Sequence, residues 1–198
     1  MDPIPYSEFV ERHRPLSEEA FLAQVRWPML LVPPFAVGGH DPADTPFLTN
    51  TFSPEALSGR LAGGRLMLVP VCKRDGANAF GSMVTVGRAP NNDLVLSNSN
   101  VSKFHAYLRK LGESWTVSDA NSRNGTELDG KRLPAEHPFP LRSGAKIRLA
   151  TLVTLEFLSP DDLYLRVRDG ELPPWRTYMP DAADPDEETE VVFTRSRG

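Results

Sequence analysis

The middle of the chain alternates short hydrophobic and polar runs, a pattern typical of strands rather than helices. Thr85 between Val84 and Val86 shows the two-residue alternation of a strand. Turn signals such as Asn124-Gly125 separate the runs. Seven runs rich in β-branched, aromatic or leucine residues are expected as strands, at residues 66–71, 83–86, 94–96, 105–110, 115–118, 146–149 and 151–158. Short strands at this spacing indicate a mainly β domain, either a sandwich or a barrel.

The first 63 residues carry a different pattern, in which short helices are expected. The Ser17 hydroxyl can accept from a free first-turn amide, so a capped helix is expected to follow it and to end at Pro28. A second short helix is expected to open at residues 53–55, with proline at the first helical position. The apolar stretch 27–35 is broken by three prolines. It is expected either to pack against the domain as an extension or to act as a separate docking segment.

Beyond residue 159 the chain becomes polar again. Residues 161–167 are expected to form either one helix capped by aspartates or a last strand. Residues 170–198 are predicted to be a largely disordered tail, because their acidic, proline-rich composition cannot bury enough apolar surface. The pattern therefore divides the chain into an N-terminal extension of unknown role (1–63), a β domain (64–159) and an acidic tail (160–198).

Charge follows the same division. Counting Lys and Arg against Asp and Glu, residues 64–159 have a balance of +5, whereas residues 1–63 have −4 and residues 160–198 have −5. General nucleic-acid binding needs a broad basic face, and an acidic chain with a basic middle argues against it. The distribution fits a local site for an anionic ligand.

Several classes of chemistry find no support in the sequence. The four histidines lack metal-ligand spacing, and a single cysteine permits no intrachain disulfide. There is no P-loop and no dinucleotide glycine fingerprint, so neither a metal nor a cofactor is expected. No apolar run approaches the roughly 20 residues of a membrane helix, and the first residues do not resemble a signal peptide. We therefore expect a cytoplasmic protein that neither inserts into membranes nor binds nucleic acid.

Three short motifs lie on three inter-strand loops and carry side chains suited to a phosphate. Arg88 follows one strand and offers a planar fork of donors. Ser102 and Lys103 precede another strand and add a hydroxyl and a point charge. Asn124, after a third strand, carries a donor and acceptors for a peptide backbone, and Gly125 permits the positive φ of an Asn-Gly turn. Loops at one end of a sandwich converge, so these side chains are expected to meet.

The spacing of these motifs closely resembles the forkhead-associated (FHA) family. The matching segments are Gly87-Arg88, 92–96, 101–106, 115–117 and 119–126. The resemblance implies a two-sheet antiparallel β-sandwich that binds phosphothreonine peptides through loops at one end. It also implies that Arg88 and Ser102 hold the phosphate and that Asn124 bonds the peptide main chain. Gly87 and His105 would be architectural, with the imidazole tying loops together.

Two positions depart from the family pattern. Lys103 stands where the family often has arginine, so a basic residue is kept. Arg123 stands where the family often has serine or threonine. Arg123 is expected either to add a phosphate contact or to alter how the third residue after the phosphothreonine is read.

These features predict an adaptor or regulator that reads phosphothreonine in Ser/Thr kinase signalling, and not an enzyme. Ser102 and His105 are the one plausible nucleophile–base pair, but no nucleophile-elbow motif surrounds the serine. The alternative is a scaffold that binds its partner without phosphate, within a larger assembly such as a secretion apparatus. Such a scaffold has no need of Arg88, Ser102 and Asn124.

The acidic tail contains one further candidate, Thr189. The segment 184–195 resembles the phosphoacceptor segments of small bacterial FHA regulators, where a Glu-Thr core precedes Val and Phe, although there the segment is N-terminal. Thr189 is therefore a candidate site for a Ser/Thr kinase, and its phosphorylated form a candidate ligand for the protein's own pocket. An inert acidic tail is the alternative.

Overall fold

The computed structural model describes residues 3–32, 66–96, 98–150 and 153–170. Its elements are β1 (Ile4–Pro5), α1 (Tyr6–His13), α2 (Glu18–Gln24), β2 (Met29–Val32), β3 (Met67–Pro70), β4 (Met83–Gly87), β5 (Leu94–Val95), β6 (Ala106–Leu111), β7 (Ser114–Asp119), β8 (Thr126–Leu128), β9 (Lys131–Arg132), β10 (Phe139–Leu141), β11 (Lys146–Leu149), β12 (Val153–Leu158) and α4 (Pro160–Asp169). The expected helix at 53–55, the expected tail and Thr189 lie outside the described residues.

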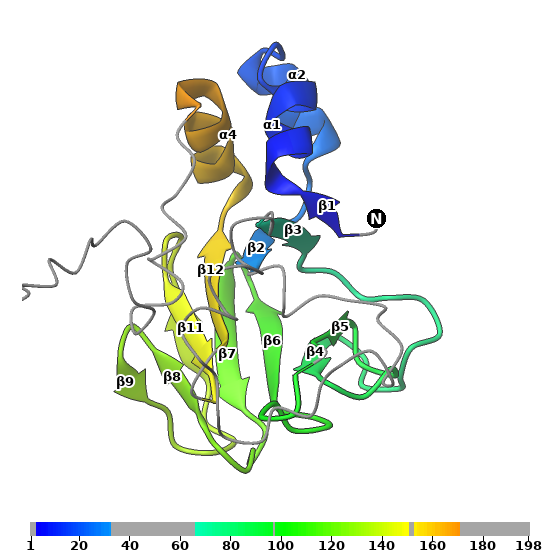
Figure 1. Ribbon diagram of the computed structural model, residues 1–198, viewed down its shortest axis with the longest axis vertical. Coiled ribbons are helices and arrows are strands. Elements are labelled where there is room, and N and C mark those ends of the chain that lie inside the picture. Colours follow the sequence, from blue (N-terminus) through cyan, green and yellow to red (C-terminus); the bar gives the residue numbers. More distant parts are fainter. Residues whose placement is uncertain (1–2, 33–65, 97, 151–152, 171–198) are drawn as a thin grey trace, which may run out of the picture.

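The described strands form two sheets, which confirms the predicted sandwich (Figure 1). One sheet has the order β1-β3-β2-β12-β11-β8-β9, and the other has the order β10-β7-β6-β4-β5. The named strand pairs are antiparallel except β4 with β5. Each of the seven expected runs contains a strand. Strands β1, β2, β8, β9 and β10 were not expected: β2 lies in a stretch broken by prolines, and the other four have only two or three residues each.

Alternate residues of the strands build the core between the sheets. In β4, Val84 and Val86 are buried in this core, and in β6 Ala106 and Leu108 are buried with them. The cluster also takes Phe157 from β12 of the other sheet. The alternation read from the sequence therefore corresponds to one face of each strand lying in the sandwich.

Strand β2 comes from the N-terminal segment and pairs with β3 on one side and β12 on the other. Its residues are buried on both faces: Leu30 and Val32 join the core between the sheets, while Met29 and Leu31 join a second core. This double burial explains why the run reads as continuously apolar. Residues 29–32 therefore pack as part of the sheet. The division of the chain into domains at residue 63 stays a prediction.

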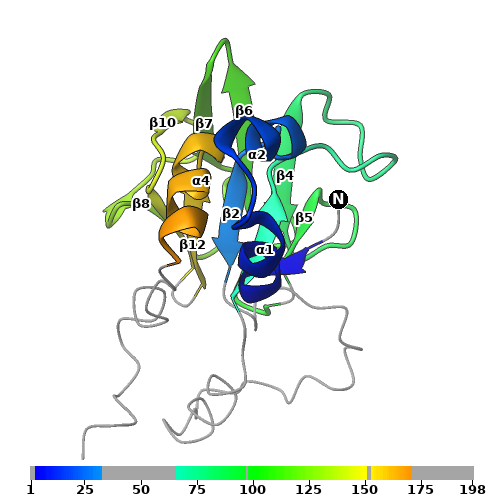
Figure 2. The same cartoon turned by 90° about the horizontal axis from the view of Figure 1, so that it is seen from above.

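The helices α1, α2 and α4 cover the outer side of this sheet at one end of the sandwich (Figures 1 and 2). Their second core includes Phe9 and Phe21 from the N-terminal helices and Leu163 and Val167 from α4. The capped helix after Ser17 is confirmed as α2, with the Ser17 hydroxyl accepting from the amide of Ala20 at 3.3 Å. None of the helices in the described ranges is long and apolar enough to span a membrane.

Residues 161–167, expected as a helix or a strand, are helical. The N-cap is Ser159 and not one of the expected aspartates: its hydroxyl accepts from the Asp162 amide at 3.2 Å. The helix ends at Asp169, and Gly170, with φ of 72°, is its C-cap. Leu163 and Val167 are four residues apart and so share the face that packs on α1 and α2. Ordered structure therefore continues ten residues into the segment that composition assigned to the tail.

Candidate functional site

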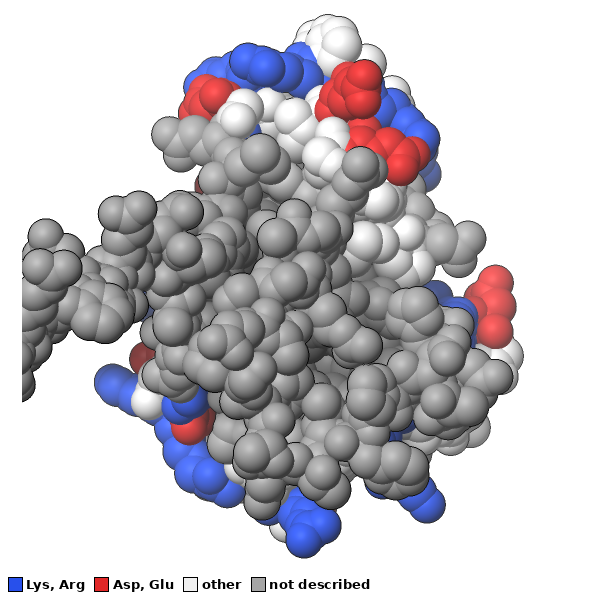
Figure 3. Space-filling view, viewed as in Figure 1, with Lys and Arg blue, Asp and Glu red and all other residues white. Residues whose placement is uncertain are grey.

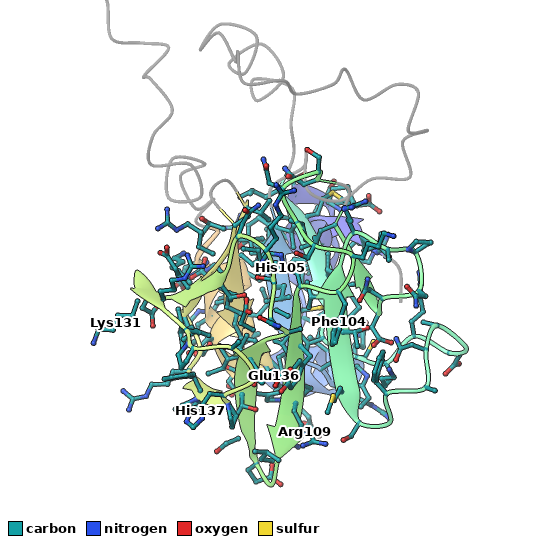
Figure 4. The ribbon with its side chains drawn as sticks, turned by 90° about the horizontal axis from the view of Figure 1, so that it is seen from below. Phe104, His105, Arg109, Lys131, Glu136 and His137 are labelled. Carbon is teal, nitrogen blue, oxygen red and sulfur yellow. The ribbon has the colours of Figure 1, made fainter. Side chains whose placement is uncertain are left out.

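The five predicted binding residues line one cleft. Arg88, Ser102, Lys103, Arg123 and Asn124 surround a volume of about 360 Å³, together with residues 99–101. The cleft lies where β4 and β7 end and β6 begins, at the end of the sandwich opposite the helices (Figure 1). Figure 4 looks onto this end, with His105 near the middle and Phe104 beside it.

Hydrogen bonds between main chains join the loop after β4 to the loop before β6. The amide of Arg88 donates to the carbonyl of Ser102 at 3.0 Å, and that of Ala89 donates to Lys103 at 3.1 Å. The buried Asn92 side chain adds bonds to the carbonyls of Lys103, at 2.6 Å, and Ala89, at 2.9 Å. These bonds hold Arg88 beside Ser102. Asn92 was included in the sequence motif but was not assigned this role.

Gly87 occupies a point where the two loops approach closely. A β-carbon at this position would collide with the carbonyl of Lys103 and approach the side-chain amide of Asn92. Glycine is therefore needed here for space and not for backbone conformation. Its position next to Arg88 explains why the Gly-Arg pair carries information about the site.

His105 is fully buried and joins two loops through its ring. Its Nδ1 accepts from the amide of Ser102 at 3.0 Å, which leaves Nε2–H to donate to the carbonyl of Gly125 at 3.1 Å. The ring is therefore a neutral imidazole with one defined tautomer. Burial lowers the pKa of His105, and the nearby Gly125 carbonyl and Asp119 carboxylate only partly offset this effect.

The Ser102 hydroxyl and the His105 ring do not form a nucleophile–base pair. Its oxygen accepts from the main-chain amide of Arg123 at 3.0 Å, whereas His105 contacts the main chain of Ser102. The hydroxyl proton therefore remains available to a ligand in the cleft. This geometry suits a donor to phosphate better than an activated nucleophile.

Asp119 shapes the loop between β7 and β8. Its carboxylate accepts from the amide of Ser122 at 2.9 Å, from the Ser122 hydroxyl at 2.7 Å and from the Thr126 hydroxyl at 2.6 Å. Burial by itself raises the pKa of Asp119, but these hydrogen bonds outweigh burial and the pKa is lowered. Gly125 has φ of 81°, so the turn can close and present Arg123 and Asn124 to the cleft.

Asn124 links this loop to the loop before β6. Its side-chain amide donates to the carbonyl of Asn100 at 2.8 Å. That bond fixes the orientation of the amide plane and leaves the side-chain oxygen for a ligand's N–H group. The contact with Asn100 could not have been found from the sequence, because a main-chain carbonyl carries no sequence signal.

The cleft is electropositive. Arg88, Lys103 and Arg123 are exposed, and no hydrogen bond or ion pair within the described ranges engages their charged groups. The residues lining the cleft include no aspartate or glutamate. In Figure 3, Lys and Arg side chains appear along the lower end of the molecule, where these loops lie in Figure 1. Three cations and a free hydroxyl proton together suit a phosphate group.

A second polar cluster, centred on Asp93, supports the turn between β4 and β5. This cluster was not predicted from the sequence. The side chain of Asp93 is fully buried and accepts from the Thr85 amide at 2.8 Å, from the Arg74 amide at 2.9 Å and from the Lys73 ammonium at 2.9 Å. Burial by itself raises the pKa of Asp93, but these hydrogen bonds outweigh burial and lower the pKa to about 2. The cluster anchors the turn that leads from β4 to β5.

Residues 84–150 match the family model of the FHA domain. This segment of the chain is an FHA domain. It carries all five candidate binding residues. The family likeness inferred from the motif spacing is thereby confirmed for residues 84–150.

Curated relatives share the FHA segment. The chain is 37% identical over 95 residues to the FHA domain-containing protein FhaB of Mycolicibacterium smegmatis, covering 48% of this chain and 53% of that protein. It is 33% identical over 64 residues to the transcriptional regulatory protein EmbR of Mycobacterium tuberculosis, covering 32% of this chain and 16% of EmbR. The matches therefore span about half or less of these relatives. A crystal structure of the MEK1 FHA domain aligns with a TM-score of 0.43 and 23% identity, covering 70% of this chain and 93% of that one.

Proposed function

We propose that the chain is a cytoplasmic adaptor or regulator in Ser/Thr kinase signalling that binds phosphothreonine peptides, and that it is not an enzyme. The observation that carries the proposal is the cleft in which Arg88, Lys103 and Arg123 have no acidic partner among the lining residues. Three cations repel one another there. A bound phosphate would relieve that repulsion through charge-assisted hydrogen bonds.

Each binding residue has a proposed role. Arg88 and Ser102 hold the phosphate oxygens, the first through its guanidinium and the second through the hydroxyl proton left free by the Arg123 amide. Lys103 and Arg123 add charge at the mouth of the cleft. Asn124, oriented by the Asn100 carbonyl, bonds the peptide main chain. His105, Gly87 and Gly125 maintain the loop geometry.

The deciding experiment is calorimetric titration of the full chain with the best peptide from a phosphothreonine library. A charge-assisted hydrogen bond contributes about 1.5–3 kcal/mol, so Arg88→Ala should weaken binding by roughly tenfold to more than a hundredfold. Arg142→Ala is the matched control, because this exposed arginine lies between β10 and β11 at the helical end. Equal binding of phosphorylated and unphosphorylated peptide would favour the phosphate-independent scaffold and overturn the proposal.

The same titration compares phosphothreonine with phosphoserine. The FHA family likeness implies a small apolar pocket for the threonine methyl group beside the phosphate. One methyl group in a fitted pocket contributes about 1–3 kcal/mol. A matched phosphoserine peptide should therefore bind about fivefold to a hundredfold more weakly, and equal affinities would contradict a threonine-specific site.

Thr189 is proposed as a phosphorylation site whose modified form occupies this cleft. It lies between Glu188 and Glu190, and residues 160–198 have a charge balance of −5 against +5 for residues 64–159. Phosphorylation would add about −1.5 to −2 charge and the oxygens that the cleft is suited to bind.

A further inference from the structure

A second cleft lies on the other side of the β7–β8 loop. It encloses about 480 Å³ and is lined by Asp119, Asn121, Ser122, Gly125 and the segment 132–135. The two clefts share one loop, because Arg123 and Asn124 line the candidate phosphate cleft while their neighbours Ser122 and Gly125 line this one. Consecutive Cα atoms are about 3.8 Å apart, so an extended peptide of a few residues can contact both clefts.

Arg132 supplies the charge of this second cleft. Its guanidinium lies against Gly125, where a β-carbon would collide with it. Arg132 is exposed, and within the described ranges its side chain takes part in no hydrogen bond or ion pair. Its neighbour Lys131 projects from β9 at one side of the same end of the molecule (Figure 4). The cleft therefore presents a positive charge beside the candidate phosphate site.

Two acids close to Arg132 in the fold, Glu127 and Asp119, are already engaged. Glu127 is its partner across the β8–β9 pair, but the Glu127 carboxylate is bound by the guanidinium of Arg148. Asp119 also lines the cleft, and it is buried and accepts hydrogen bonds from Ser122 and Thr126. Neither carboxylate neutralises Arg132 directly, which leaves the guanidinium for an external acceptor.

The remaining wall is apolar and held in place. Leu133, Pro134 and Ala135 line it, and Leu133 is 6% exposed. The amide of Leu133 donates to the carbonyl of Thr126 at 2.9 Å, and the amide of Glu136 donates to the main-chain carbonyl of Asp119 at 2.8 Å. An apolar wall beside a single guanidinium fits a side chain with methylene groups and a terminal carboxylate.

We propose that this cleft is a second peptide subsite, in which Arg132 binds a carboxylate side chain of the same phosphopeptide. The proposal rests on the proposed function, because it assumes that the neighbouring cleft holds the phosphorylated residue. It makes Arg132 a specificity-determining residue. Peptides with an acidic residue at one fixed distance from the phosphothreonine are then preferred.

The test uses the full chain and phosphothreonine peptides in which one glutamate is moved along an otherwise neutral sequence, each paired with a glutamine peptide. An exposed ion pair contributes about 0.2–1 kcal/mol, so at one position glutamate should bind roughly two- to fivefold more tightly than glutamine. Arg132→Gln should abolish this preference. Arg142→Gln, with the same change of charge at the helical end, should keep it, and the preference should shrink as salt is added.

Charge exchange provides a second arm. Arg132→Glu should prefer lysine over glutamate at the same peptide position, which a general loss of folding would not produce. The subsite is overturned if Arg132→Gln keeps the wild-type preference, or if no position shows a preference in the wild-type protein. Failure of the proposed function gives a different result from failure of the subsite alone. In that case phosphorylated and unphosphorylated peptides bind equally, Arg88→Ala has no effect, and the subsite proposal fails as well.

Discussion

Individual side chains at the loop end act mainly by satisfying main-chain groups of neighbouring loops. His105 accepts from the Ser102 amide and donates to the Gly125 carbonyl, while Asn124 donates to the Asn100 carbonyl. These bonds leave the charged ends of Arg88 and Arg123 free for a ligand. The polar residues therefore fall into two groups, those that position the loops and those that face the cleft.

Removal of the imidazole should destabilise the fold. In His105→Ala the Ser102 amide and the Gly125 carbonyl lose their partner, and each unsatisfied buried group costs about 1–3 kcal/mol. We expect a loss of about 2–4 kcal/mol in the free energy of unfolding, measured by urea denaturation. His137→Ala, at an exposed position, should change stability little. A fully stable His105→Ala with altered chemistry would contradict the architectural role.

The same residue should make stability depend on pH. Because the pKa of folded His105 lies below its ordinary value of 6.5, the unfolded chain takes up the proton first as the pH falls. Its contribution is complete above about pH 6.5 and is lost progressively below that value. Urea denaturation at pH 7, 6 and 5 should show a fall in stability that is smaller in His105→Ala. Equal slopes in the two proteins would show that His105 is not the group responsible.

At the scale of elements, the helical layer and the loop site occupy opposite ends of the sandwich. Helix α4 is tied to β12 through the buried Glu156, which receives both terminal nitrogens of Arg166 at 2.9 Å. Its apolar face packs with α1 and α2 in the second core. Stability at this end should therefore be separable from ligand binding at the other.

Two leucines of α4 allow a matched test of this separation. Leu163 is fully buried, whereas Leu165 is 44% exposed. Leu163→Ala should lower the free energy of unfolding by about 2–4 kcal/mol, since it removes buried methyl groups and leaves a cavity. Leu165→Ala should cost about 0.5 kcal/mol or less. Calorimetry should find the same phosphopeptide affinity in both folded variants, and a weaker affinity in Leu163→Ala alone would show that the two ends are coupled.

At the scale of the whole molecule, the opposite charges of the basic domain and the acidic tail lead us to predict that the protein binds its own phosphorylated tail. The protein phosphorylated at Thr189 should bind the best library peptide more weakly than the unmodified protein, because its own phosphothreonine competes for the cleft. An intramolecular ligand acts at an effective concentration in the millimolar range. The measured affinity of a library peptide with a micromolar Kd should therefore fall about tenfold or more. Thr189→Ala, treated with the same kinase, is the control. Unchanged affinity and unchanged size by gel filtration would contradict self-recognition, whereas dimers would show exchange between copies.

The amino-acid sequence by itself indicated a mainly β domain, and the resemblance of its motifs to the FHA family narrowed this to a sandwich with a candidate site on its loops. Alternation along the strands depends on local periodicity, and Arg88, Ser102 and Asn124 are recognisable because their spacing reflects the loops that the strands must connect. The cap at Ser17 was readable for the same reason, since a hydroxyl and an amide three residues apart interact within one turn.

Tertiary structure decided the features that depend on contacts between distant segments. Residues 29–32 form a central strand because they bury one face in each core. An apolar stretch broken by prolines does not reveal this in the sequence. Residues 160–169 became a helix because Leu163 and Val167 meet α1 and α2. The Arg132 guanidinium is left for a ligand because the Glu127 carboxylate is bound by Arg148 and the Asp119 carboxylate is bound within its own loop. Which acid pairs with which base depends on distances between residues that are far apart in the sequence, so spacing along the chain does not reveal it.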